Sequence, residues 1–304
     1  MHPDWPLLVD SWRLALESDG YSRHTRRTYK AAVDSLAVWM AEHAPGVGPT
    51  ELERAHVRGW LAAVRAARSV ATARSWIAGV RHFARFLVAE GEMTTDPTEG
   101  VKTPPPADPR GRVLTEAECK RLVAACEGSR FEDRRDAAIL LLFLDGGLRL
   151  GELGGLQLDD VDLVDRTVFV LGKGSARSGP RRRMVPLGTK AARALDRYIR
   201  ARRRHPHAEL GGLWLGQRGQ PGLSLDGIDL VVKRRAKLAG LRGVHPHLLR
   251  HTWAHHFRAA GGSEGDLMVL GGWRNRAMLD RYGRGGAEQR AAGAARRYSL
   301  GDRL

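Results

Sequence analysis

Four short stretches of this sequence contain arginine, lysine, histidine and tryptophan, residue types that could stabilise the charge of a phosphodiester under attack. They are Gly147–Leu153 (GLRLGEL), Gly172–Gly174 (GKG), His247–His251 (HLLRH) and Leu270–Trp273 (LGGW), with a tyrosine nine residues further on. Attack on phosphorus raises the negative charge of the phosphodiester, which fixed cations must stabilise if no metal does so. The candidates for such a site are Arg149, Lys173, His247, Arg250, Trp273 and Tyr282.

Two arginines are expected to stabilise the transition state. Arg149 and Arg250 suit this role because a guanidinium forks across two phosphate oxygens and stays charged. Pro246 favours the first turn of a helix, which places His247 and Arg250 on one face near the positive end of the helix dipole. Taken singly, these residues are better explained as a surface histidine and a structural ion pair. Their place in the series favours catalysis.

The other candidates supply a proton, a hydrogen-bond donor and a nucleophile. Lys173 lies between two glycines of a predicted hairpin turn and could protonate a leaving 5′ oxygen, unless it is an ordinary turn lysine. Trp273 could donate from its indole nitrogen to a phosphate oxygen, or it could only pack the core. Tyr282 is the candidate nucleophile, because nearby arginines would favour its phenolate form through opposite charge.

Two further residues are predicted to support this site. Glu152 follows Arg149 by three residues and can orient that arginine or a neighbouring histidine. A plain helix salt bridge would need the same spacing, so both interpretations stay open. His251 is expected to pack against its neighbours or orient them rather than react itself.

In this order, the stretches resemble the catalytic motifs of the tyrosine recombinase (phage integrase) family, with its Xer-like members. The family pattern is G-L-R-x-G-E-L, G-K-G, H-x-L-R-H, then L-G-H or G-G-W, and a final tyrosine, which matches all six candidates. Trp273 departs from the commonest pattern, since most members have histidine there. A minority have tryptophan and remain active, so the departure counts only against the housekeeping branch that resolves dimers.

The resemblance implies a site-specific DNA recombinase for integration, excision or resolution. Tyr282 would attack a DNA phosphodiester, form a 3′-phosphotyrosine and release a 5′ hydroxyl, without ATP, metal or another cofactor. Strand exchange between two sites implies self-association into a tetramer on double-stranded DNA. Two alternatives are a type IB topoisomerase, which uses the same intermediate, and a non-catalytic DNA-binding protein of the same fold. Compact size argues against the first, and retention of all six residues argues against the second.

The elements that must position these residues are predicted to be mainly α-helical, in two domains. A proline-rich linker at residues 104–112 separates residues 1–103 from residues 113–304. In the first domain, apolar residues at helical spacing predict a helix that includes Tyr29–Met40 and another at Val70–Ala89. Gly20–Thr25 and the helix after it resemble the family's helical, SAM-like core-binding domain.

The second domain is predicted to be mainly α with a small antiparallel β-sheet, as the family's catalytic fold is. Thr115–Glu118 has the pattern of a capping box, and Thr167–Leu171 with Arg183–Leu187 predicts a β-hairpin. Predicted helices cover Asp136–Leu144, Lys190–Arg204, Leu225–Ala239, Pro246–Ala260 and Glu264–Leu270. A tail from Ala287 is expected to form a short helix that docks on a neighbouring subunit, as the resemblance implies, or on its own.

The charge of the chain favours a polyanionic partner. Fifty Lys and Arg residues against 34 Asp and Glu give a net charge of +16. A GC-rich genome would explain the choice of arginine over lysine, but not the surplus over acids. The predicted DNA contacts are arginines of one helix face and of the hairpin region: Arg74, Arg81, Arg85, Arg177, Arg181, Arg182 and Arg183. A solvated helix face is the alternative for the first three.

The remaining features exclude other classes of protein. The longest apolar run, Ala137–Leu144, is too short to span a bilayer, and the N-terminus lacks the pattern of a secretory signal. Cys119 and Cys126 are too few for a disulfide framework, and their spacing predicts core thiols on one helical face. The sequence therefore predicts a cytoplasmic protein that acts on the bacterial nucleoid.

Overall fold

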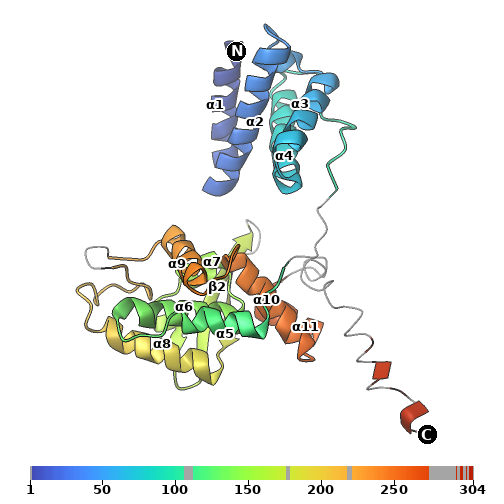
Figure 1. Cartoon of the computed structure of the whole chain (residues 1–304). Helices are drawn as coiled ribbons and strands as arrows, with labels where there is room; N and C mark the ends of the chain where they lie inside the picture. The colour runs from blue at the N-terminus through green and yellow to red at the C-terminus, as the bar shows by residue number, and fades with distance from the viewer. Residues whose placement is uncertain are drawn as a thin grey trace. The chain divides into compact units, whose positions relative to one another are not determined.

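The computed structural model divides into two compact units, Met1–Asp108 and Pro109–Leu304 (Figure 1). It describes residues 2–105, 112–175, 179–217 and 221–273, with Ala292, Ala295, Arg296, Ser299 and residues 301–303. Of residues 173–175 and 179–181, only the backbone is described. Within these ranges, no helix combines the length and the apolar character that crossing a membrane requires.

The first unit is helical throughout its regular structure. Its elements are α1 (Asp4–Ser18), α2 (Arg23–His43), the 3-10 turn η1 (Pro49–Glu51), α3 (Arg54–Ala67) and α4 (Val70–Ala89). Ser22 and Ser69 start α2 and α4, because each side chain accepts a hydrogen bond from a backbone amide of the first turn. In Figure 1, α1 and α2 (blue) lie side by side.

Apolar faces of these helices form the core of the first unit. Trp5, Trp12 and Trp60 are almost fully buried in it. The faces predicted from helical spacing are confirmed, since every predicted apolar residue is buried: Val33, Leu36, Ala37, Met40, Ile77, Val80, Phe83, Ala84 and Leu87. The Val70–Ala89 helix has the predicted bounds.

The second unit combines helices with one small sheet, as predicted. Its helices are α5 (Glu116–Ala124), α6 (Phe131–Gly146), α7 (Leu150–Gly154), α8 (Thr189–Arg202), α9 (Leu225–Leu238), α10 (Pro246–Ala259) and α11 (Glu264–Gly271). The 3-10 turns are η2 (Leu158–Asp160) and η3 (Gly301–Arg303), and the strands are β1 (Val161–Asp162), β2 (Thr167–Ser175) and β3 (Gly179–Pro186). The strands are antiparallel in the order β1-β2-β3, and α6 packs against α8 and α10 (Figure 1).

The predicted helix at Asp136–Leu144 and the predicted hairpin strands need correction, since β2 extends beyond Leu171 to Ser175 and β3 runs from Gly179 to Pro186. Helix α6 begins at Phe131 rather than Asp136, because its first turns are polar and the apolar pattern misses them. Asp133 and Asp136 in these turns are nevertheless buried, and they pair with Arg235 of α9 at 3.0 and 2.8 Å. Strand β1 was not predicted, because two residues carry too little pattern.

The two cysteines are core thiols, but they do not share a helix. Cys119 lies in α5, which ends at Ala124, so Cys126 lies just beyond it. Cys126 is buried, Cys119 is half-buried, and both are free thiols. Burial raises the pKa of Cys119 to about 11 and that of Cys126 to about 12, so both thiols are protonated at neutral pH.

Candidate active site

A pocket of about 590 Å³ in the second unit brings together residues of two predicted motifs. Arg149, His247, Arg250 and His251 line it, with Asp229 and His245 among their neighbours. The two motifs are about a hundred residues apart in the sequence, so the fold gathers them. No group of His, Cys, Asp and Glu side chains in the described part of the chain could hold a metal ion.

The N-terminus of α10 holds the histidines of this pocket. Pro246 is the first helical residue, and the His245 side chain caps the helix by accepting from the Leu248 amide at 3.2 Å. One turn apart, Nε2 of His247 lies 3.1 Å from Nε2 of His251. Burial, and then the proximity of His247, His245 and Arg250, beside which a further positive charge is unfavourable, lowers the pKa of His251 to about 4. A neutral His251 can therefore accept a hydrogen bond from His247, which suits the orienting role predicted for it.

Glu152 forms the centre of an arginine cluster on one wall of the site. Its side chain is 3% exposed and accepts from the backbone amide of Arg149 at 2.8 Å and from the guanidinium at 2.6 Å. Arg183 of β3 binds both carboxylate oxygens at 2.9 Å, and Arg250 of α10 lies 3.9 Å away. Three arginines from three different elements thus share one carboxylate. Glu152 contacts Arg149, which both the orienting role and a plain helix salt bridge require, so the role stays a prediction; its other described partners are arginines and not a histidine.

The pKa of Glu152 reflects these contacts. Burial in the site raises it, but hydrogen bonds and positive charge from Arg183, and then from Arg149, outweigh burial and hold it at about 2. The carboxylate is therefore ionised at neutral pH. Its negative charge balances guanidinium groups that would otherwise repel one another.

The C-terminal end of α11 binds the same three arginines. Arg183 Nε donates to the carbonyl of Leu270 at 2.9 Å, Arg250 to that of Gly271 at 2.5 Å, and Arg149 to that of Gly272 at 3.1 Å. These carbonyls lie at the negative end of the helix dipole, where cations are favourable. Gly272 ends the helix with a φ of +61°, and a Cβ there would lie 3.3 Å from the Arg183 guanidinium.

A second glycine brings α6 close to α10. Gly147 ends α6 with a φ of +55°, and a Cβ at this position would lie 2.0 Å from the Trp253 ring. The Gly147 carbonyl accepts a hydrogen bond from Arg250. Glycine is therefore required at position 147, which begins the stretch that carries Arg149.

Trp273 covers the buried guanidinium of Arg250. The Arg250 carbon Cζ lies 4.7 Å from the centre of the indole, and the centres of the Trp253 and Trp273 rings are 6.1 Å apart. Trp273 is 5% exposed and belongs to a small cluster with Trp253, Ala254 and Leu267. Packing, one of the two roles considered for this residue, is therefore observed, and donation to a phosphate stays a prediction.

We expect Trp273→His to keep a substantial part of the expected DNA-cleavage activity and Trp273→Ala to lose a larger part of it. Imidazole can donate a hydrogen bond as indole does, whereas alanine removes the donor and leaves a cavity of the kind that costs about 3–5 kcal/mol in a core. The measurement is single-turnover cleavage beside thermal unfolding of each variant. Equal losses of cleavage in both variants would show that the shape of the ring matters and not its donor.

For several predicted site residues the structure does not describe the side chain. Tyr282 and Arg177 are outside the described residues, as is almost all of the predicted tail helix at 287–300. Lys173 lies within strand β2 and not in the turn, in the stretch between Gly172 and Ser175 where the pairing with β3 is irregular. Only the backbone of Lys173 and Arg181 is described, so their roles stay predictions.

The predicted DNA-contact arginines with described side chains fall into three groups. Arg74 donates to Pro104, Arg81 to Val101 and Thr103, and Arg85 lies 3.8 Å from Asp96, so this stripe contacts its own unit. Arg182 is exposed, over the Phe169 ring and 3.2 Å from Asp160. Arg183, at 14% exposure, faces Glu152 instead of solvent. This placement gives no support to the predicted DNA contact of Arg183, which stays untested.

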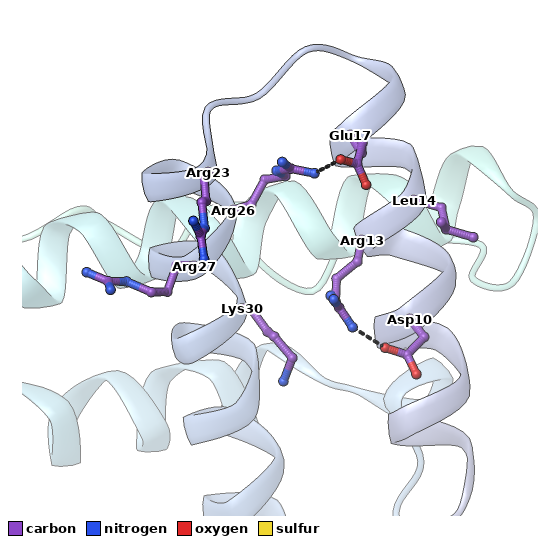
Figure 2. A pocket seen from close by; sticks show the side chains of 8 residues that line it. All are labelled: Asp10, Arg13, Leu14, Glu17, Arg23, Arg26, Arg27 and Lys30. Atoms are coloured by element: carbon purple, nitrogen blue, oxygen red, sulfur yellow. Dashed lines mark hydrogen bonds and ion pairs between the residues drawn. The ribbon is translucent and has the colours of Figure 1, made fainter. Parts of the chain in front are cut away.

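Sequence reasoning missed a basic pocket of about 600 Å³ between α1 and α2 (Figure 2). Arg26 of α2 reaches across to Glu17 of α1, and Arg13 pairs with Asp10 at 2.8 Å. In the part of the chain that the structure describes, no carboxylate pairs with the exposed Arg23 or Arg27. The signal was present in the sequence, since its cations on α2 follow helical spacing: Arg23, Arg26, Arg27 and Lys30.

Comparison with known protein families agrees with this geometry. The sequence pattern of the phage integrase family matches residues 112–288, and that of the phage integrase N-terminal SAM-like domain matches residues 9–91. This chain therefore belongs to the phage integrase family. The resemblance found in the motifs and the fold class predicted from it are confirmed.

Individual relatives cover most of the chain. Tyrosine recombinase XerD of Listeria monocytogenes serotype 4b (strain F2365) is 30% identical, over 84% of this chain and 86% of its own. Tyrosine recombinase XerC of Ralstonia pickettii (strain 12J) is 31% identical, over 88% and 84%. Among solved structures, an arginine-to-lysine variant of the Tn1549 transposon integrase, in complex with a circular intermediate DNA, is similar in fold. Its TM-score is 0.75, with 16% identity over 96% of this chain and 99% of its own.

Proposed function

We propose that this chain is a site-specific DNA recombinase that cleaves and rejoins strands through a 3′-phosphotyrosine at Tyr282. The observation that carries the proposal is the pocket in which Arg149, His247 and Arg250 converge. Named relatives in this family are tyrosine recombinases, and DNA is bound in a structural neighbour. None of those relatives is a topoisomerase, which leaves the relaxation alternative without support of its own.

The proposed reaction assigns one task to each side chain. Arg149 and Arg250 stabilise the charge that develops on the phosphate oxygens. The Tyr282 hydroxyl attacks phosphorus, its proton passes to His247, and Lys173 donates a proton to the leaving 5′ oxygen. The 5′ hydroxyl of the partner strand then attacks the same phosphorus and releases the tyrosine. The number of phosphodiester bonds is conserved, so the exchange needs no external energy source.

The organisation around this chemistry is part of the proposal. Residues 1–103 would form the core-binding domain, residues 113–304 the catalytic domain, and residues 104–112 the linker, and the boundary between the two compact units falls in that linker. The protein would act as a tetramer on DNA, in the cytoplasm at the nucleoid. A lambda integrase tetramer on a Holliday junction is among the structural neighbours, which supports this stoichiometry.

Covalent capture tests the function directly. The protein is incubated with nicked genomic DNA fragments, in which the cleaved strand cannot be rejoined, and the DNA that stays attached after denaturation is sequenced. A recombinase should yield one recurrent sequence with the protein joined to its 3′ phosphate. Failure to form any covalent adduct would contradict the proposed chemistry, and adducts spread over unrelated sequences would contradict site specificity.

We expect DNA binding to weaken steeply with salt, and the basic pocket between α1 and α2 to carry part of that dependence. Each phosphate contact contributes a slope of about 0.9 in log affinity against log salt concentration, because neutralised phosphates release counterions. Arg23→Gln with Arg27→Gln should therefore lower the slope by about 1.8. The measurement is half-site affinity across a salt series.

An exposed arginine elsewhere in the same unit provides the control. Arg65 lies on α3 and does not line the pocket. The slope of log affinity against log salt concentration for Arg65→Gln should therefore stay within about 0.9 of that for the unsubstituted protein. Equal slopes for the double variant and the control would show that this pocket does not face DNA.

A further inference from the structure

Arg183 is neither exposed, as a surface cation would be, nor one of the residues that line the pocket. Its guanidinium makes three hydrogen bonds, two to the Glu152 carboxylate and one to the Leu270 carbonyl, all at 2.9 Å. Its side chain is 14% exposed, and it does not line the pocket. Strand β3 is thereby joined to α7 and to the end of α11 through one side chain.

We infer that Arg183 is a positioning residue, which joins the end of α11 to Glu152 and so sets where Arg149 and Arg250 point. This inference rests on the proposed recombinase function. Arg149 and Arg250 each use some of their donors on the carbonyls of Gly272 and Gly271, so a shift of α11 moves both guanidiniums. The same shift moves Trp273, which follows directly and covers Arg250. In the sequence, Tyr282 follows Trp273 by nine residues.

The geometry also explains why the residue is arginine. A planar guanidinium binds both carboxylate oxygens of Glu152 with two nitrogens and has its third nitrogen left for Leu270. Lysine would keep the charge but could not make this fork. On β3, Arg183 alternates with the exposed Arg182 and Met184 and shares a face with the buried Val185.

The test compares Arg183→Met with a matched variant of another buried arginine. Arg235→Met also removes an arginine bound to two carboxylates in this unit, at 6% exposure, but outside the pocket. With a nicked duplex that carries the captured sequence, Arg183→Met should slow single-turnover cleavage by about 10–100-fold, as loss of an orienting partner does elsewhere. Half-site affinity should stay within about threefold of wild type, and Arg183→Lys should recover part of the rate. Arg235→Met should lower the unfolding temperature while the folded protein cleaves normally.

A pH series adds a readout that loss of stability alone does not move. Charged groups face Glu152 from three elements, namely Arg149, Arg183 and Arg250. Without Arg183, burial raises the pKa of Glu152 with less to oppose it. The ratio of Arg183→Met to wild-type cleavage rates should therefore fall as pH is lowered from about 7 to about 5. It should stay level for Arg235→Met.

Three cleavage or binding results would overturn the inference, as would a fourth from hydrogen exchange. The three are equal cleavage losses in the two methionine variants after correction for folded fraction, a cleavage ratio that does not change with pH, and a weaker salt dependence of binding in Arg183→Met. The last would return Arg183 to the DNA contacts. Amide hydrogen exchange separates this inference from the function it rests on. If wild type forms no adduct, the proposed function fails, whereas unchanged exchange across Glu264–Gly271 in Arg183→Met refutes the positioning role by itself.

Discussion

Replacing Tyr282 with phenylalanine should abolish covalent capture of DNA while half-site binding stays near that of the unsubstituted protein. The change removes one oxygen, which is the atom that forms the bond to phosphorus, and leaves the ring in place. Binding is spread over many phosphates, so it does not depend on that oxygen. The measurement is denaturing electrophoresis of adducts on a nicked duplex, beside a gel-shift titration of the same duplex.

Tyr298 provides the matched control, because it is the only other tyrosine after Trp273 in the sequence. Tyr298→Phe should form adducts at the rate of the unsubstituted protein. Adducts that persist in Tyr282→Phe and vanish in Tyr298→Phe would move the nucleophile to Tyr298. Loss in both variants would show that Tyr298 is needed for cleavage as well, whereas adducts that persist in Tyr282→Phe would remove the assigned role of Tyr282.

Arg250→Ala should reduce the rate of strand cleavage by about 10²–10³-fold, with affinity for a half-site changed by no more than about threefold. The charge that develops in the transition state lies on one phosphate, whereas affinity comes from many. Arg250 is 1% exposed and is held by the carbonyls of Gly147 and Gly271 under the Trp273 ring, so its direction is fixed before DNA binds. The measurement is single-turnover cleavage of the nicked duplex.

Loss of a buried arginine also destabilises a protein, and Arg202 controls for this effect. Arg202 is 2% exposed and binds the carbonyls of Ala208, Leu213 and Gly212 at 3.0, 3.1 and 2.7 Å, outside the pocket. Arg202→Ala should lower the unfolding temperature as much as Arg250→Ala, and the folded fraction should cleave at the normal rate. Cleavage by Arg250→Ala within about tenfold of the unsubstituted rate would remove Arg250 from the proposed clamp.

The parts of the site that the sequence predicts are those that depend on local structure. Pro246 and the spacing of His247 and Arg250 suffice to place both residues near the N-terminus of a helix, which is where they lie. Capping of α5 by Thr115 and Glu118 is confirmed for the same reason, since the two residues interact across one turn. Such features follow from helical geometry alone.

The contacts that join distant segments could not be predicted in this way. Arg183 and Glu152 are 31 residues apart, and their pairing depends on how β3 aligns with β2 and α7. In a sequence this rich in arginine, residues 181–183 suggest a basic surface. Alternation along a strand was the missed signal, because it places Arg183 on the same face as the buried Val185.

Buried charge misled the sequence interpretation in a second place. Arg135, Asp136 and Arg235 are at most 5% exposed, yet their types suggest solvent-facing positions. Buried ion pairs of this kind cannot be recognised from the spacing of apolar residues. For this reason the helix predicted at Asp136–Leu144 starts about one turn after the observed start at Phe131.

The single carboxylate shared by Arg149, Arg183 and Arg250 has an evolutionary consequence. Substitution of any one arginine changes the charge that the other two meet, so the effects of two substitutions in this set should not add. We therefore expect the effect of changing one of these four residues to depend on which residues occupy the other three positions. Such epistasis would link segments that are far apart in the sequence, namely α7 with its N-cap Arg149, β3 and α10.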